Sequence, residues 1–233
     1  MLIRDFELLA VDVDGTITGP DLGLDLTAVK VLRELGKRVK VALVTGNAYP
    51  IALSIFRYVR PSGERLIIAE NGGAIIVNGD VRKHPDGGLK DRVIGYLRER
   101  GYERLISEDT YLRVADVALR GDELTLMRIK AELEERFPEA VIRYSGYALH
   151  VMPKGVNKGS GLVSLCEMTG VPCSKVVAIG DSYNDIDMFE VAGFSIALPQ
   201  APKEVKDRAN MVAPGKGYGE SLTLALALLL NSL

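Results

Sequence analysis

The stretch "LLAVDVDGTIT", residues 8–18, runs from four apolar residues straight into two aspartates and a glycine. The apolar half is typical of a buried strand, and Asp12 and Asp14 stand where that strand ends. Positions i and i+2 of a strand face the same side, so the two carboxylates lie close together if the strand continues through them. If the strand stops there, both lie in the loop at its carboxyl end. Either way, a pair of acids at the end of a buried strand marks the candidate chemical centre.

Apolar strands alternate with helices in the first third of the chain and again after residue 154. Continuous apolar strands separated by helices indicate a parallel sheet that is covered on both faces. We therefore predict an α/β fold with a doubly wound (Rossmann-like) parallel sheet core formed by residues 1–79 and 154–233. Thr27 is the predicted N-cap of the first helix. The expected strands are 6–14, 39–46, 65–73, 175–182, 194–199 and 210–213, and the main expected helices are 27–38, 49–59, 158–170, 185–193 and one that includes 222–230.

Residues 80–153 follow a different pattern and are predicted to form a smaller, inserted α+β cap domain. A hairpin at Asn78-Gly79 leads into it, since that dipeptide favours a two-residue turn. Apolar and polar residues alternate in the last two strands, as in an antiparallel sheet with one wet face. The expected elements are helices around 88–100 and 122–136 and strands around 111–119, 140–145 and 147–153.

Polar residues follow several of the core strands, and open α/β sheets bind ligands just outside the carboxyl ends of their strands. Clustered carboxylates repel each other unless a cation compensates. An oxygen-rich cluster without histidine suits a hard ion such as Mg²⁺, which can also bind a phosphate oxygen. We therefore expect a magnesium and phosphate site at one edge of the sheet. The residues that the topology brings there are Asp12, Asp14, Thr45, Asp181 and Asp185, with Asn71 nearby.

Composition excludes some classes of partner. The net charge is −2, so no strong basic field indicates a nucleic acid or an acidic membrane. The longest apolar run, residues 222–230, is too short to span a bilayer and is expected to be a buried final helix or to pack on a second subunit of a homodimer. No signal peptide is recognisable, which favours a cytoplasmic location. Cys166 and Cys173 lack a CxxC spacing and are expected to be ordinary buried thiols.

Four ordered segments carry a family resemblance. "DVDGT" at 12–16, "VTGN" at 44–47, "VNKG" at 156–159 and "GDSYNDIDM" at 180–188 resemble the motifs of the haloacid dehalogenase superfamily. "AENGGAI" at 69–75 is similar to the segment before the cap in its Cof-like branch, and the insert resembles that branch's C2-type cap. A compact cap together with "TGN" resembles the archaeal phosphoglycolate phosphatases.

The resemblance implies a role for each motif residue. Asp12 would attack phosphorus and form an aspartyl-phosphate, while Asp14 would act as general acid and base. Lys158 would neutralise the phosphoryl charge, the alternative being a solvated surface lysine. The Asp12 side chain, the Asp14 carbonyl and Asp181 would bind Mg²⁺, and Asp185 would bind it directly or through water. Thr45, Gly46, Asn47 and Asn184 would bind or orient the substrate. The alternative for Thr45 is a helix cap alone, and Asn71 either touches the substrate or forms a turn.

The cap would read the leaving group, with Arg143, Tyr144 and His150 as candidates, whereas Asp187 is expected to face away from the site. The implied activity is a Mg²⁺-dependent hydrolysis of a small-molecule phosphomonoester, foremost 2-phosphoglycolate. A sugar-phosphate phosphatase, a phosphomutase and a non-catalytic phosphate-binding module are the alternatives. Dehalogenation is disfavoured, because Asp14 and the acidic motif at 180–188 point to phosphoryl transfer.

Overall fold

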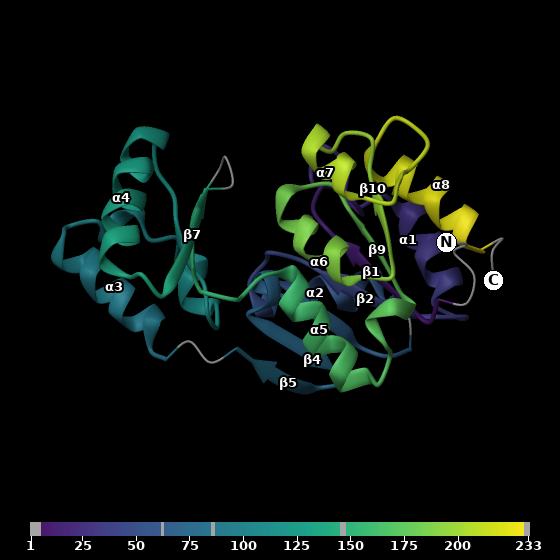
Figure 1. Cartoon of the computed structure of the whole chain (residues 1–233), viewed down its shortest axis with the longest axis horizontal. Coiled ribbons are helices and arrows are strands. Elements are labelled where there is room, and N and C mark those ends of the chain that lie inside the picture. The colour runs from purple at the N-terminus through teal and green to yellow at the C-terminus, as the bar shows by residue number, and fades with distance from the viewer. Residues whose placement is uncertain (1–5, 62, 85–86, 145–147, 231–233) are drawn as a thin grey trace.

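The computed structural model describes residues 6–61, 63–84, 87–144 and 148–230, and Figure 1 shows a larger and a smaller part joined by two chain crossings. The helices and strands of the larger part are β1 (Leu8–Asp12), α1 (Leu26–Leu35), β2 (Lys40–Val44), α2 (Tyr49–Val59), β3 (Leu66–Ala69), β4 (Ala74–Val77), β5 (Asp80–Lys83), α5 (Lys158–Thr169), β9 (Val176–Gly180), α6 (Ile186–Val191), β10 (Phe194–Ala197), α7 (Lys203–Arg208), β11 (Met211–Val212) and α8 (Tyr218–Leu230). Those of the smaller part are α3 (Leu89–Glu99), β6 (Val117–Leu119), α4 (Glu123–Arg136), β7 (Ala140–Tyr144) and β8 (Leu149–Pro153).

The larger part contains one sheet in the order β11-β10-β9-β1-β2-β3-β4-β5. The strands from β11 to β3 pair in parallel, as predicted. β1 lies between β2 and β9, with Leu8 opposite both Lys40 and Val176 and with Asp12 opposite Val44. The carboxyl end of β1, where Asp12 stands, is therefore near the middle of the sheet.

Helices cover both faces of this sheet, which explains why its central strands are apolar at every position. Leu9, Val11 and Leu43 belong to a core cluster with residues of α1, α2 and α8. Leu8 and Ala10 belong to a second cluster on the opposite face, with residues of α5, α6 and α7. Figure 1 shows α5 and α6 on one side of β1 and β2, and α1 and α8 on the other. The doubly wound α/β fold is confirmed.

The N-cap predicted for the first helix is wrong by two residues. Asp25 is the N-cap of α1, and its Oδ1 atom accepts hydrogen bonds from the backbone N–H groups of Thr27 and Ala28 at 2.8 and 2.9 Å. A carboxylate satisfies these unpaired donors and also interacts favourably with the helix dipole. Thr27 lies inside the first turn.

The predicted hairpin at Asn78-Gly79 is confirmed, with positive φ angles of 54° and 113° at the two residues. It joins β4 and β5, which pair antiparallel at the edge of the large sheet. The boundary predicted between residues 79 and 80 therefore falls inside a hairpin of this sheet. The three strands of the smaller sheet all lie within the predicted insert.

The smaller part is a three-stranded antiparallel sheet in the order β6-β8-β7. One face of this sheet carries Val117, Leu149 and Val151, which pack in a separate core with residues of α3 and α4. Figure 1 shows these helices on the side away from the large sheet. The other face of the small sheet is left to point toward the core strands.

The strand predicted over 111–119 is wrong in its first half. Residues Glu108–Leu112 form a 3-10 helix, and only Val117–Leu119 pair as a strand. The backbone N–H groups of Val114 and Ala115 donate to the Glu70 carboxylate instead of to a neighbouring strand. A tertiary contact has replaced the sheet ladder in this segment.

The apolar run at 222–230 lies in α8, and Leu222, Leu226 and Leu229 pack in the core beside α1. Within the described part of the chain, no helix has both the length and the apolar character that crossing a membrane requires. The Sγ atoms of Cys166 and Cys173 are 2.6 Å apart.

Candidate active site

A cavity of about 910 Å³ lies between the carboxyl ends of the core strands and the open face of the small sheet. Its core side includes Asp12, Asp14, Asn47, Asn71 and Asn184. Its cap side includes Arg113, Arg120, Arg143, Tyr144 and His150. The fold thus places predicted site residues from distant parts of the sequence in the lining of one cavity.

Lys158 is buried at the floor of this site, so the surface-lysine alternative is wrong. Only 1% of the residue is exposed. Its Nζ atom lies 2.5 Å from Asp12 Oδ1 and 2.6 Å from Asp185 Oδ1. Lys158 begins α5, whose N-terminus is closed by a capping box between Asn157 and Ser160.

Close backbone packing explains how α5 brings Lys158 to this depth. A Cβ atom on Gly161 would lie 2.7 Å from Ile68 Cγ2 and 2.9 Å from Gly72 Cα. Contacts this short are not possible for a real side chain, so only glycine lets the first turn of α5 approach the end of β3. The glycine is thus a requirement of the lysine's position.

Burial strongly affects the pKa values of the charged side chains at the floor of the site. Burial is the main influence on the Asp12 carboxyl group and raises its pKa well above the usual range, with Asp185 and Asp181 adding to the rise and Lys158 opposing it. Burial alone would lower the pKa of Lys158, but Asp12 and Asp185 outweigh it and the net pKa is raised. Burial also raises the pKa of Asp181. Three carboxylates therefore face one ammonium group that keeps its charge.

Asp181 is held by two residues that sequence reasoning did not select. Its Oδ1 atom accepts a hydrogen bond from the Thr16 hydroxyl at 2.8 Å, and its Oδ2 atom accepts one from Gln200 Nε2 at 3.2 Å. Gly15 passes beside it with φ +83°, and a Cβ there would lie 2.5 Å from Asp181 Oδ2. Thr16 belongs to the "DVDGT" segment and could have been found from it. Gln200 gave no signal in the sequence.

The donor set fits a hard cation. Asp12, Asp181 and Asp185 can each present one oxygen such that these atoms lie within 4.8 Å of one another. Asp185 Oδ1 accepts from Lys158, and its Oδ2 accepts from the backbone N–H groups of Asp181 and Ser182. These bonds hold Asp185 in place beside Lys158 and the backbone of Asp181, and Asp185 still belongs to the group of three that could bind a cation. Oxygen ligands and excess negative charge are what Mg²⁺ requires.

The loop after β2 forms the next wall of the site. Thr45 is buried, and its Oγ1 atom accepts hydrogen bonds from the backbone N–H of Asn47 at 3.0 Å and from Asn47 Nδ2 at 2.9 Å. Ala48, not Thr45, stands at the start of α2, so the helix-cap role proposed as the alternative for Thr45 is not seen. Asn47 Nδ2 also donates to Asp14 Oδ2 at 2.7 Å. The loop thereby orients the second aspartate of the opening stretch.

Asn71 and Asn184 lie side by side at the edge of the cavity. Asn184 Nδ2 donates to Asn71 Oδ1 at 3.0 Å, and Asn184 Oδ1 accepts from the Ser182 hydroxyl at 2.8 Å. Glu70 and Asn71 both have left-handed backbone angles, with φ 52° and 51°. Such angles are uncommon outside glycine and occur at sites whose surroundings fix them. Asn71 therefore both forms a turn and lines the larger cavity.

Two contacts between the core and the cap differ from expectation. Asp187 lines the cavity and its Oδ2 atom accepts a 3.3 Å hydrogen bond from Arg143, so the prediction that it faces away is wrong. Arg113 is 8% exposed and donates from Nη1 to the carbonyl oxygen of Gly46 at 2.9 Å. Sequence reasoning missed Arg113, although a charged residue among the apolar ones of "YLRVADVAL" was the available signal.

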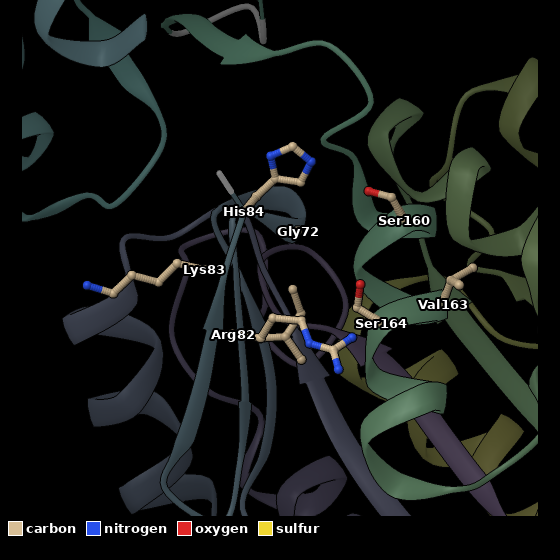
Figure 2. Close-up of a pocket in the computed structure, with 8 residues that line it drawn as sticks. Gly72, Arg82, Lys83, His84, Ser160, Val163 and Ser164 are labelled. Carbon is tan, nitrogen blue, oxygen red and sulfur yellow. The ribbon is translucent and has the colours of Figure 1, made fainter. Parts of the chain in front are cut away.

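A second, smaller cavity of about 410 Å³ lies between β5 and α5. Figure 2 shows the guanidinium group of Arg82 turned toward Ser164 and the amino group of Lys83 pointing away from the other labelled residues. Arg82 Nη1 pairs with Glu167 at 2.6 Å. No carboxylate is found among the described residues that line this cavity. It therefore lacks the acid pair that defines the larger site.

Comparison with known proteins agrees with this geometry. Residues 90–217 match the haloacid dehalogenase-like hydrolases. A phosphoglycolate phosphatase from Methanosarcina acetivorans is 36% identical over 226 residues, which cover 96% of each chain. One from Methanothermobacter thermautotrophicus is 36% identical over 220 residues, 92% of this chain and 96% of the relative. A crystal structure from Thermoplasma acidophilum has a TM-score of 0.85 at 24% identity and covers 99% of this chain and 100% of its own.

The chain belongs to the haloacid dehalogenase-like hydrolases. The family expected from the four ordered segments is confirmed, and the protein is an enzyme. The solved structure adds the fold alone, because its sequence identity is low.

Proposed function

We propose that this enzyme is a Mg²⁺-dependent phosphomonoester hydrolase that works through an aspartyl-phosphate on Asp12 and acts on 2-phosphoglycolate. One observation carries the proposal. Asp12, at the end of the central strand, shares one cavity with Asp14 and lies within hydrogen-bond reach of the buried Lys158. A carboxylate nucleophile, a proton-transfer group and a fixed positive charge are what phosphoryl transfer needs.

Asp12 is oriented for attack by its partners. Lys158 holds Oδ1 at 2.5 Å, which leaves Oδ2 to form the bond to phosphorus. Attack breaks the bond between phosphorus and the ester oxygen and leaves an acyl-phosphate on Asp12. Asp12 and Asp181 would hold the Mg²⁺, with Asp185 binding it directly or through water, and the charge of the ion would keep Asp12 ionised and neutralise the phosphoryl oxygens.

Asp14 is placed to exchange protons with the leaving group. It is exposed to the cavity, and Asn47 Nδ2 fixes its Oδ2 atom. Asp14 gives a proton to the departing alkoxide and then takes one from the water that attacks the acyl-phosphate. This return of the proton restores both aspartates for the next turnover. Thr45 and the backbone of Gly46 and Asn47 would bind the phosphoryl oxygens.

Charge on the cap side supports an anionic leaving group. Arg113, Arg120, Arg143 and His150 stand on that side, and none of the described cap residues that line the cavity is acidic. A phosphomonoester whose far end carries a carboxylate would find its charge matched there. 2-Phosphoglycolate has that arrangement, and it is the compound for which the curated archaeal relatives are named.

Cavity size favours a second candidate. A space of about 910 Å³ is in the range that holds drug-sized ligands and is much larger than a two-carbon acid needs. A larger substrate such as a sugar phosphate would fill it without further closure of the cap. The chemistry proposed for Asp12, Asp14 and Lys158 is the same for both substrates.

Phosphate release from a panel of phosphomonoesters, with and without Mg²⁺, tests the proposal. We expect kcat/KM to be highest for 2-phosphoglycolate and activity to disappear after chelation. The Asp12→Asn variant should lose at least about 10³-fold in kcat while its circular dichroism is unchanged. Substantial turnover by that variant, or full activity after exhaustive chelation, would contradict the mechanism. A preference for sugar phosphates would contradict only the substrate.

A further inference from the structure

A chain of short polar contacts crosses from the core to the cap beside the active-site cavity. Arg113 Nη1 donates to the carbonyl oxygen of Gly46 at 2.9 Å and to Asp116 Oδ2 at 2.8 Å. The same Asp116 oxygen lies 2.8 Å from His150 Nδ1. The loop proposed to bind phosphate is thus connected to a histidine of the small sheet through two side chains.

Arg113 and Asp116, which connect Gly46 to His150, are themselves held by other protein groups. Arg113 also donates from Nε and Nη2 to Asp109 Oδ2, at 3.1 and 2.7 Å, so four of its hydrogen bonds go to protein groups. Asp116 is 0% exposed. Its Oδ2 atom contacts both the Arg113 guanidinium and the His150 imidazole, which limits its freedom to move, while its buried Oδ1 atom has no hydrogen-bond partner in the described part of the chain. Arg113 and Asp116 therefore fix the position of His150 relative to Gly46.

His150 differs from them because it faces the cavity. In the small sheet, Ala118, His150 and Arg143 stand in register across the three strands, and all three line the cavity. Their neighbours Leu149 and Val151 point to the opposite face and pack on the cap helices. Since Nδ1 is engaged by Asp116, Nε2 is the ring nitrogen that remains for a ligand.

The surroundings of Nε2 favour a negatively charged ligand group. An imidazole whose Nδ1–H donates to Asp116 becomes a donor at both nitrogens once it is protonated. A negatively charged group at Nε2 would then accept a charge-assisted hydrogen bond. Of the described cap residues that line the cavity, three are arginines and none is acidic, although Arg143 also pairs with Asp187 of the core at 3.3 Å.

We propose that Arg113 and Asp116 are positioning residues that hold His150 opposite the phosphate loop, and that His150 Nε2 binds the anionic end of the leaving group. This inference rests on the proposed phosphatase function and assigns the reading of the leaving group to one cap residue. It also makes the distance between Gly46 and His150 a fixed property of the site, which selects leaving groups by length as well as by charge.

Two substrates of equal carbon number separate this role from a structural one. 2-Phosphoglycolate ends in a carboxylate, whereas 2-hydroxyethyl phosphate ends in a neutral hydroxyl group. The His150→Asn variant keeps an amide donor near the place of Nδ1 but has no atom at the place of Nε2. We expect it to lower the ratio of kcat/KM for 2-phosphoglycolate over 2-hydroxyethyl phosphate about 10- to 100-fold, mainly through KM. His84→Asn, at a histidine outside this cavity, is the matched control and should leave the ratio unchanged.

The positioning residues have their own signatures. Asp116→Asn should lower the same ratio, and the double variant with His150→Asn should be no worse than His150→Asn alone, because both changes act through one contact. Arg113→Lys should raise KM for both substrates, since it loosens the carbonyl of Gly46 at the phosphate end, and should also lower the ratio, since it loosens Asp116 and with it His150. A general loss of folding would not produce this pattern.

Several results would overturn the inference. One is an unchanged ratio with His150→Asn, including an equal loss of kcat/KM on both substrates. Another is a fall in the ratio with Arg143→Gln but not with His150→Asn. A wild-type enzyme that cleaves phosphomonoesters with no preference for the acid would also overturn it and leave the phosphatase function intact. If the wild type cleaves none of the panel, the proposed function fails. Calorimetric binding of 2-phosphoglycolate and 2-hydroxyethyl phosphate to Asp12→Asn, with and without His150→Asn, then decides the role of His150 without turnover.

Discussion

The Nζ atom of Lys158 lies 2.5 Å from Oδ1 of Asp12, and both side chains are removed from solvent. The two residues are 146 positions apart in the sequence. Asp185 shares the same ammonium group at 2.6 Å. One cation thus partly compensates two buried carboxylates, and its removal should affect folding as well as catalysis.

We predict that Lys158→Met abolishes turnover and lowers the free energy of unfolding by about 3–5 kcal/mol in metal-free buffer, because it leaves buried charges without their partner. Chemical denaturation with and without Mg²⁺ measures this, and Mg²⁺ should recover part of the loss. Lys154→Met, at an exposed lysine of the same segment, is the control and should change stability by less than about 0.5 kcal/mol. Equal effects of the two substitutions would argue against the buried pair.

The raised pKa of Asp181 predicts how the metal-free protein responds to pH. A carboxyl group whose folded pKa lies above its unfolded value binds its proton more tightly in the folded state. Its contribution to stability is therefore full below the unfolded pKa and is lost as pH rises through the folded pKa. As pH rises through the folded pKa, the Tm of the wild type should fall relative to that of Asp181→Asn. Thermal scans in the presence of a chelator would show this.

Mg²⁺ should reverse this trend. Its ligands must be ionised, so its affinity increases with pH, and the rise in Tm on adding Mg²⁺ should be larger in neutral than in acidic buffer. Asp109 has a lowered pKa, so its contribution to stability changes with pH in the opposite direction to that of Asp181. Asp109 is present in both the wild type and Asp181→Asn, so its contribution cancels when the two are compared. A Mg²⁺ effect that does not depend on pH would contradict a site made of these carboxylates.

The Glu70 side chain connects the cap to the start of α2. Its buried carboxylate accepts hydrogen bonds from the backbone N–H groups of Tyr49, Val114 and Ala115 at 2.8–3.1 Å. Glu70→Gln would set an amide N–H₂ group against these donors and should cost about 1–3 kcal/mol. Urea denaturation measures this loss. Glu108→Gln, at an exposed glutamate of the cap, should be nearly neutral, and a similar loss there would remove the special role of Glu70.

Two glycines inside helices provide a matched pair. Gly161→Ala would place a methyl group 2.7 Å from Ile68 Cγ2 and 2.9 Å from Gly72 Cα, so we expect α5 to shift, Lys158 to move and kcat to fall at least about 10-fold. Gly95 in α3 has open space around it, and Gly95→Ala should stabilise the protein by about 0.5–1 kcal/mol through helix propensity. Thermal unfolding and steady-state kinetics on both variants test this. An active, stabilised Gly161→Ala would contradict the close approach.

The sequence by itself determined the parallel core, because strands that are apolar at every position can only be buried on both faces. It also indicated the end of β1 as the candidate site, since Asp12 and Asp14 follow an apolar strand directly and the other polar strand ends must meet at the same edge. These are local patterns that need no knowledge of distant contacts. The order of the four segments, and hence the family, was readable for the same reason.

Only the tertiary structure decided the contacts between segments far apart in the chain. Thr16 and Gln200 meet at Asp181, and Arg113 reaches Gly46, because the fold closes separations of 165, 19 and 67 positions that carry no periodic signal. The first part of the strand expected at 111–119 is absent for the same reason, since the Glu70 carboxylate accepts hydrogen bonds from the backbone N–H groups of Val114 and Ala115. The local sequence pattern determines which residues are buried or paired in a strand. The partners of a buried charge depend instead on which distant segments the packing of helices and strands brings next to it.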